Sequence, residues 1–273
     1  MRTIVHLSDL HFGSVLASTL EPLLACVHAL APDLVIVSGD LTQRAREQQF
    51  RDAQAYLAKL PRPLLVVPGN HDIPLYDVVR RFVSPLGRYR HFVTDDLSPT
   101  FIDHDIAVVG INSARSLTFK GGTLSKAQVA DAAQRFQALP DHPVRIVVTH
   151  HPFDIPEGLT GVSVVQGAAQ ALRRFAECRV ELLLTGHLHL VHRATAAVFV
   201  PGYHAHLLGA GTATSTRARG EPNSFFVLRL DAGRRDRFRI TADTYAWNAA
   251  LGVFGVVDTR SLGNDATSAI AAM

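Results

Sequence analysis

Five short apolar stretches of the sequence are each followed at once by side chains that bind cations. The groups that follow them are Asp9 with His11, Asp40, Asn70 with His71 and Asp72, His150 with His151, and His187 with His189. Carboxylate, amide and imidazole groups without any thiolate suit Mn, Fe, Zn or Co as the metal. A carboxylate such as Asp40 has two oxygens and can bridge two cations. Because the set is too large for one ion, the sequence predicts a centre of two metal ions.

The spacing within these groups places their ligand atoms on one side of the chain. Asp9 and His11 are two residues apart, as are His187 and His189, and side chains repeat every two residues in extended backbone. Glycines at positions 39, 69 and 186 allow sharp turns and a close approach to a ligand. A single histidine at the end of a strand is usually structural. All five groups in this order favour a metal site instead.

Buried strands must carry these groups. Residues 3–7, 34–37, 64–67, 106–111, 144–148 and 181–184 are rich in Val, Ile and Leu without alternation, which is typical of strands covered on both faces. Helices are predicted between them, at residues 18–30, 45–60, 125–139 and 167–177. Ligand sites in such sheets form beyond the carboxyl ends of the parallel strands. We therefore expect the five groups to meet at one edge.

The last part of the sequence has a different pattern. Strand-like runs at residues 195–200, 225–230, 238–244 and 252–256 are separated by turn signals such as Pro201-Gly202. This pattern predicts an antiparallel region after the α/β region. The expected fold is α/β, with two sheets packed together and helices outside.

Length and composition fit one folded domain. A chain of 273 residues is near the upper limit for one hydrophobic core, so we expect a single domain at residues 1–257 and a flexible tail at residues 258–273. The net charge of +3 is too small to indicate nucleic acid. Cys26 and Cys178 are expected to be small apolar residues rather than a disulfide. The apolar runs are far shorter than the roughly 18 residues of a membrane helix, and the N-terminus does not resemble a signal peptide. These features predict a cytoplasmic protein without membrane insertion, and a homo-oligomer is compatible with them.

Taken together, the motifs resemble those of the calcineurin-like metallophosphoesterase superfamily. The matching segments are Asp9-x-His11, Gly39-Asp40, Gly69-Asn70-His71-Asp72, Val147-x-x-His150 and Gly186-His187-x-His189. The β-rich end and the absence of long insertions make the chain most similar to the bacterial class III branch of cyclic nucleotide phosphodiesterases and glycerophosphodiesterases. The resemblance implies a four-layer α/β/β/α sandwich of two mixed β-sheets flanked by helices.

The resemblance also implies a role for each residue. One metal ion would be bound by Asp9, His11, Asp40 and His189, and the second by Asp40, Asn70, His150 and His187. His150 is preferred to His151 because it occupies the Val-x-x-His position of the family. A hydroxide bridging two metal ions would attack the phosphorus. His71 would be the catalytic residue that protonates the leaving alkoxide or bonds a phosphoryl oxygen, and Asp72 would orient His71 or hold the turn.

Polar residues outside the motifs are candidates for substrate binding. Asn112, Arg115 and Lys120 follow the strand at residues 106–111, and either contact substrate phosphate or lie in a solvated loop. His151 is a further candidate beside the metal ligands. The Gly- and Thr-rich segment 209–219, which contains Arg217, forms either an active-site wall or a structural turn. The cluster of Arg80, Arg81, Arg88 and Arg90 either caps an anionic substrate or decorates a solvated face.

The leading hypothesis is a phosphodiesterase acting on a small diester, of the cyclic nucleotide or glycerophosphodiester type. After the segment that contains Asp40, the class III branch often continues with an acidic residue and a glycine, whereas this sequence has Gln43-Arg44-Ala45. The surface that faces the substrate is therefore expected to differ. An alternative is the lipid A precursor (UDP-diacylglucosamine) pyrophosphatase, but that family usually has Arg where this chain has His71. A DNA repair nuclease and a catalytically silent scaffold are further alternatives, although no DNA-capping domain is apparent and no ligand is missing.

Overall fold

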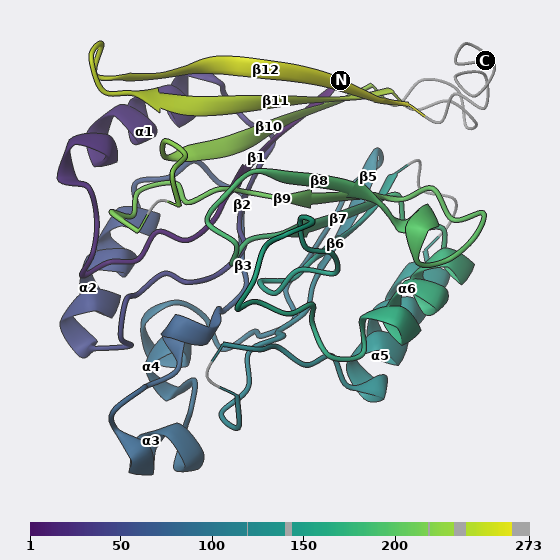
Figure 1. Ribbon diagram of the computed structural model, residues 1–273, viewed down its shortest axis with the longest axis horizontal. Helices are drawn as coiled ribbons and strands as arrows, with labels where there is room; N and C mark the ends of the chain where they lie inside the picture. The colour runs from purple at the N-terminus through teal and green to yellow at the C-terminus, as the bar shows by residue number, and fades with distance from the viewer. Residues whose placement is uncertain (119, 140–143, 218, 232–238, 264–273) are drawn as a thin grey trace.

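Two β-sheets pack face to face between two layers of helices in the computed structural model (Figure 1). The structure describes residues 1–118, 120–139, 144–217, 219–231 and 239–263. The strand order is β12-β11-β10-β1-β2-β3 in the first sheet and β4-β5-β6-β7-β9-β8 in the second. Both sheets are mixed, which confirms the predicted fold class.

The first sheet combines parallel strands from the start of the chain with antiparallel strands from its end. Its strands are β1 (Arg2–Leu7), β2 (Leu34–Val37), β3 (Leu64–Val66), β10 (Ser224–Asp231), β11 (Arg239–Asn248) and β12 (Val253–Gly263). β1, β2 and β3 run parallel, whereas β10 pairs antiparallel with β1. The carboxyl ends of the three parallel strands therefore lie at the same edge.

The second sheet also combines parallel and antiparallel strands. Its strands are β4 (Thr100–Ile102), β5 (Ile106–Gly110), β6 (Val144–Val148), β7 (Leu182–Thr185), β8 (His192–Thr195) and β9 (His206–Gly209). β5, β6, β7 and β9 run parallel to one another, and β4 and β8 pair antiparallel at the two edges.

Helices cover the outer faces of the two sheets (Figure 1). α1 (Ala17–Ala29) and α2 (Glu47–Leu57) lie on the first sheet, and α5 (Lys126–Gln137) and α6 (Ala168–Glu177) lie on the second. α6 buries Ala168, Ala171, Leu172 and Phe175, the spacing of one helix face. The remaining helical segments are α3 (Val78–Val83), α4 (Gly87–Phe92), η1 (Asn70–Asp72) and η2 (Ala196–Val198).

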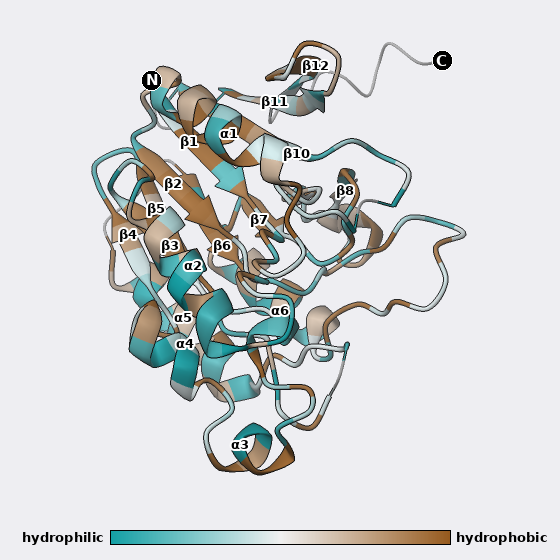
Figure 2. Ribbon diagram, turned by 90° about the vertical axis from the view of Figure 1, so that its left-hand side faces the viewer, coloured by the Kyte–Doolittle hydropathy of each residue, from teal (hydrophilic) through white to brown (hydrophobic). Residues whose placement is uncertain are grey.

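Three separate apolar cores fill the spaces between these four layers. In β2, Val35 and Val37 pack toward the helices, whereas Leu34 and Ile36 pack between the sheets. A strand buried on both faces needs an unbroken apolar run, which is why the sequence shows no alternation there. Figure 2, coloured by hydropathy, shows β1 and β2 as largely brown strands inside a shell that contains many teal segments.

Several elements differ from the predicted ones. The predicted strand at residues 195–200 is instead the end of β8 followed by η2, because Ala196 accepts hydrogen bonds from the N–H groups of Phe199 and Val200 ahead of the Pro201-Gly202 turn. α3 and α4 were not predicted. β12 continues to Gly263, so residues 258–263 pair with β11 rather than begin a tail; Thr259, for example, donates to Asp243 over 2.7 Å. The rest of the expected tail lies outside the described residues.

Two further sequence predictions concern single features. Cys26 and Cys178 are both free thiols. Within the part of the chain that the structure describes, no helix combines the length and the apolar character needed to span a lipid bilayer.

Candidate metal centre

The five predicted groups meet where the two sheets present the carboxyl ends of their parallel strands. They follow β1, β2 and β3 of the first sheet and β6 and β7 of the second. Two clusters of candidate ligands result, one of Asp9, His11, Asp40 and His189 and the other of His150, His151 and His187; within each, the ligand atoms lie within 4.8 Å of one another.

The first cluster has the geometry of an incomplete coordination shell. His189 Nε2 lies 3.1 Å from Asp9 Oδ1, and His11 Nε2 lies 3.0 Å from His189 Nε2 and 3.6 Å from Asp40 Oδ2. Asp9 Oδ1 and Asp40 Oδ2 are buried and accept no hydrogen bond. Buried polar atoms are normally satisfied, and a cation among these oxygens and nitrogens would satisfy them. The residues present therefore fit a metal ion.

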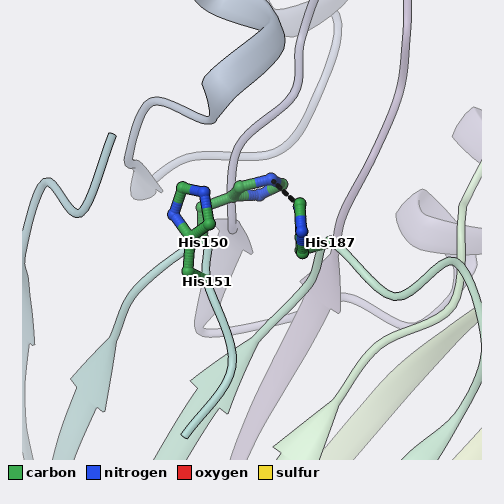
Figure 3. Close-up of side chains that lie close together, drawn as sticks. All are labelled: His150, His151 and His187. Carbon is green, nitrogen blue, oxygen red and sulfur yellow. Dashed lines mark hydrogen bonds between the residues drawn. The ribbon is translucent and has the colours of Figure 1, made fainter. Parts of the chain in front are cut away.

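The second cluster is arranged around His150. Its Nε2 lies 3.3 Å from Asp40 Oδ2 and 3.2 Å from Asn70 Oδ1. The same atom lies 3.3 Å from His187 Nδ1 (Figure 3). The Nδ1 atom of His150 donates to the carbonyl of Ser38 over 2.7 Å, which leaves Nε2 free for a ligand. Asp40 Oδ2 thus faces imidazole nitrogens of both clusters.

His151 occupies a different position from its neighbour His150. Its Nδ1 atom is 2.8 Å from the hydroxyl of Ser113, and its ring lies beside that of His187 (Figure 3). The side chain that approaches Asp40 is that of His150, and the preference for His150 as the metal ligand stays a prediction.

The backbone of the centre is unusual. Asp9, His11, Asp40, His187 and His189 all have positive φ angles, between 52° and 73°. Residues other than glycine rarely adopt this left-handed conformation, and when they do the strain is often held at a functional site. The conformation turns these side chains toward one another directly after each strand.

Two glycines allow the strand ends to approach closely. A Cβ atom at Gly186 would lie 1.8 Å from Ser8 Oγ, and one at Gly69 would lie 2.1 Å from Asp40 Oδ1. No side chain fits at either position without displacing the candidate ligands, which gives these glycines the close-approach role predicted from the sequence.

The carboxylates of the centre are charged and share protons with the imidazoles that face them: Asp40 raises the pKa of His150 to about 9 against the effect of burial, so a metal ion would displace that proton. Burial opposes ionisation of Asp9 and Asp40, but the surrounding imidazoles, His189 for Asp9 and His150 for Asp40, hold the pKa of each carboxyl well below its usual range. Burial and the nearby His150 lower the pKa of His187 to about 3. Charged carboxylates and a neutral imidazole are the forms in which these groups bind metal ions.

His71 borders the centre, and its ring has three polar contacts, one of them between Nδ1 and Arg44 Nη1 at 3.3 Å. Its Nδ1 atom donates to the carbonyl of Gln43 over 2.8 Å, and its Nε2 atom accepts a hydrogen bond from Arg217 over 3.0 Å. Burial lowers the pKa of His71. The Gln43 carbonyl orients the ring, and the sequence offered no signal for it because every residue has a carbonyl.

Asp72 holds the turn that carries His71. It is fully buried and accepts hydrogen bonds from the backbone N–H groups of Leu41, Thr42 and Gly69, at 3.2, 2.9 and 2.9 Å. Of the two roles considered for this residue, these contacts favour the structural one.

The segment after β9 contributes to both the fold and the site. Thr212 and Thr214 are buried, and their hydroxyls donate to the carbonyls of Asp9 and Leu10, each over 2.7 Å. These bonds hold the end of β1, while Arg217 reaches His71. The described part of residues 209–219 therefore has the contacts of a structural turn, and the active-site wall stays a prediction that rests on the contact between Arg217 and His71.

Asn112 and Arg115 lie away from the clustered ligands. They line a separate cavity of about 370 Å³ beside α4. Asn112 Oδ1 accepts from the N–H of Ala114 over 2.9 Å, and Arg115 donates to the carbonyls of Asn112 and Ala114. Both side chains thus stabilise their own loop.

The arginines at positions 80–90 do not act as one group. Arg80 pairs with Asp77 on the surface, and Arg88 donates to the carbonyl of Ala45. Arg81 is buried and donates to the carbonyls of Pro74 and Thr118 over 2.9 and 2.6 Å. Of the four arginines at positions 80, 81, 88 and 90, only Arg81 lines the cavity next to His71.

Comparison with protein families shows which class this fold and site define. Residues 2–191 match the family model of the calcineurin-like phosphoesterases. The chain therefore belongs to the calcineurin-like phosphoesterase family, and the resemblance inferred from the motifs is confirmed. Membership supports the predicted enzyme class, a metal-dependent hydrolase of phosphoric esters.

Curated relatives carry phosphodiesterase names. A probable glycerophosphodiester phosphodiesterase of Arcobacter nitrofigilis is 28% identical over 166 residues, which cover 59% of this chain and 58% of the relative. A 3′,5′-cyclic-nucleotide phosphodiesterase of Nostoc is 24% identical over 182 residues, covering 63% of each chain. The match thus spans less than two thirds of the length of these relatives.

Solved structures share the fold at low sequence identity. A dimetal phosphatase from Danio rerio superimposes with a TM-score of 0.65 at 15% identity, over 96% of this chain and 98% of that one. A purple acid phosphatase from yellow lupin seeds gives a TM-score of 0.67 at 11% identity, over 95% of this chain and 53% of that one.

Proposed function

We propose that this protein is a phosphodiesterase that hydrolyses a small phosphodiester with two metal ions. The position of Asp40 carries the proposal. Its buried Oδ2 atom accepts no hydrogen bond and lies 3.6 Å from His11 Nε2 and 3.3 Å from His150 Nε2, between the two clusters. One carboxylate oxygen so placed is suited to bridge two cations.

The residues around Asp40 divide into two ligand sets. Asp9, His11 and His189 would hold one ion with Asp40, and Asn70, His150 and His187 would hold the other. Ser8 Oγ and the N–H of His187 bond Asp9 Oδ2 over 2.6 and 2.9 Å, and so turn Oδ1 toward the ion. The N–H of His71 bonds Asp40 Oδ1 over 2.8 Å and does the same for Asp40 Oδ2.

Two cations held by these residues would polarise phosphoryl oxygens and lower the pKa of water. Hydrolysis forms a bond between a water oxygen and phosphorus and breaks one ester P–O bond. The departing alkoxide needs a proton, and His71, at the edge of the centre, would supply it from Nε2 in the imidazolium form, with both ring nitrogens protonated. The Gln43 carbonyl fixes the ring for this role, and Arg217 adjoins Nε2 from the neighbouring loop.

The choice of a diester as substrate is supported by the relatives. Their names include glycerophosphodiester and cyclic-nucleotide phosphodiesterases. Either type of compound presents one phosphorus with a single negative charge, which a dinuclear centre can neutralise.

A hydrolysis panel with reconstituted metal tests the proposal. The protein would be loaded with Mn, Zn, Fe or Co and assayed with bis(p-nitrophenyl) phosphate, p-nitrophenyl phosphate, and 2′,3′- and 3′,5′-cyclic AMP. We expect metal-dependent turnover of the diesters above that of the monoester. Preference for the monoester, or no turnover by protein with two ions bound, would contradict the proposal; the second result would favour the scaffold alternative.

A further inference from the structure

A small pocket beside the candidate metal centre is lined by cationic side chains. It has a volume of about 200 Å³ and shares Asn70 and His71 with the centre. Its charged lining consists of Arg44, Arg81, Lys120 and Arg217, and no described acidic residue lines it. The positive charge therefore adjoins the atoms that would contact the scissile phosphate.

Three of these cations come from separate loops and are open to a ligand. Arg44 is partly buried, and Lys120 and Arg217 are exposed. None of the three forms an ion pair with a carboxylate among the residues that the structure describes. In contrast, the surface arginines Arg51 and Arg80 are each paired with an acidic residue. Like charges gathered without counter-charges repel one another, and an anionic ligand relieves that repulsion.

The fourth cation sets the shape of the pocket. Arg81 is only 3% exposed, and its guanidinium joins the carbonyl of Pro74 to that of Thr118. This link ties the loop that carries Lys120 to the chain just before α3. The pocket wall is thus held by a buried side chain rather than by mobile surface groups.

The size of the pocket limits what can enter it. About 200 Å³ is below the roughly 300 Å³ at which pockets for whole ligands begin. A compact phosphate, phosphonate or carboxylate on a short chain matches this volume. Ile73 and Leu75, the apolar residues of the lining, suit the carbon atoms of such a chain.

We propose that this pocket binds a second anionic group of the substrate, so that the preferred substrates are phosphodiesters in which one alcohol carries its own phosphate, phosphonate or carboxylate. The inference rests on the proposed phosphodiesterase function and narrows its substrate class. Arg44, Lys120 and Arg217 would bind the second anion while the metal centre binds the scissile phosphate. Charge-assisted hydrogen bonds from such groups are among the stronger polar contacts of proteins.

Two matched probes test this inference on the metal-loaded protein. The first is p-nitrophenyl propyl phosphate, and the second is p-nitrophenyl 3-phosphonopropyl phosphate, which differs only in its added anionic group. We expect kcat/KM to be at least about tenfold higher for the anionic probe, mainly through a lower KM. Equal values, or a preference for the neutral probe, would overturn the inference and leave the proposed function intact.

Substitution of Lys120 assigns the effect to the pocket. Lys120→Gln should lower kcat/KM for the anionic probe about five- to tenfold and leave the neutral probe unchanged, because the side chain is exposed and lies outside the metal centre. Lys59→Gln, which removes an exposed lysine that follows α2 and pairs with Glu21 of α1, is the control and should change neither value. An equal loss on both probes would overturn the assignment.

A binding measurement separates this inference from the proposed function. If the protein hydrolyses neither probe, the proposed function fails. Calorimetry then measures the affinity of the protein for the anionic probe and tests the pocket independently of hydrolysis. Weaker binding to the Lys120→Gln variant than to the unaltered protein would support the pocket, and equal binding would overturn it.

Discussion

The candidate metal centre and the cationic pocket adjoin each other but are built in different ways. The ligands of the centre follow five buried strands, and Asp9, His11 and Asp40 are almost fully buried. The pocket takes Arg44, Lys120 and Arg217 from three loops, and two of these side chains are exposed. Under the proposed function, reaction chemistry would rest on residues held by the buried strands, and substrate choice on loop residues that can vary without unfolding the protein.

The difference predicts how each region responds to substitution. A change in the centre should remove metal or catalysis for every substrate. A change in the pocket should alter KM for some substrates and leave the metal in place. The following substitutions are arranged from the largest expected effect to the smallest.

Asp40→Ala should abolish activity, with a loss of at least about 10³-fold in kcat, and should reduce the bound metal. Both ligand sets lose an oxygen, because Asp40 Oδ2 faces His11 and His150 alike. Metal content by mass spectrometry and hydrolysis of bis(p-nitrophenyl) phosphate check this result. Asp52→Ala, at an exposed site on α2, is the control. Full metal content in the Asp40 variant would show that Asp40 does not bridge two metal ions.

His71→Ala should keep its metal and lose about 10²–10⁴ in kcat, the range for a general acid. The side chain bonds Gln43 and Arg217, and its ring meets the edge of the His11 ring with 4.9 Å between the centroids, but His71 belongs to neither ligand cluster. His104→Ala, which removes a histidine that is 95% exposed, should have no effect. An undiminished rate in the His71 variant would remove this residue from the mechanism.

Gly186→Ala should weaken metal binding about tenfold or more. The new Cβ atom would collide with Ser8 Oγ and lie 2.6 Å from Asp9 Oδ2, so the hydrogen bond that orients Asp9 cannot persist unchanged. Titration of the metal-free protein with Mn²⁺ measures the change. Gly255→Ala is a matched control because a Cβ there has open space around it. Equal affinities would show that the close approach is not needed.

Arg217→Gln should have the smallest effect, a rise in KM of less than about tenfold with metal content unchanged. The guanidinium is exposed and its contact with the site is the bond to His71 Nε2. Steady-state kinetics on the anionic probe measure KM for this variant and for the unaltered protein. Arg260→Gln on β12 is the control. Loss of metal in the Arg217 variant would contradict the separation between centre and pocket.

The strand-end residues could be predicted from the sequence because their placement follows from the fold. Once β1, β2, β3, β6 and β7 are recognised as parallel strands, the residue after each strand must lie at the shared edge. Asp40 and His150 come together in this way although they are 110 positions apart in the sequence.

The sequence left two alternatives for loop residues because local contacts decide their positions. Asn112 and Arg115 were expected either to contact substrate phosphate or to lie in a solvated loop, and their side chains bond to their own loop and line a second cavity. The helices α3 and α4 and the role of the Gln43 carbonyl were not predicted. Tertiary packing determines both, and neither has a side-chain pattern in the sequence. Lys120 and Arg217 lie far apart in the sequence, and only the folded chain brings them to the lining of one pocket.

The most direct test of this account is anomalous diffraction from crystals of the protein soaked with Mn²⁺. We expect two anomalous peaks that share Asp40, one surrounded by Asp9, His11 and His189 and the other by Asn70, His150 and His187. A single peak, or a second peak held by His151 with Asp40 on only one ion, would contradict the dinuclear centre proposed for this protein.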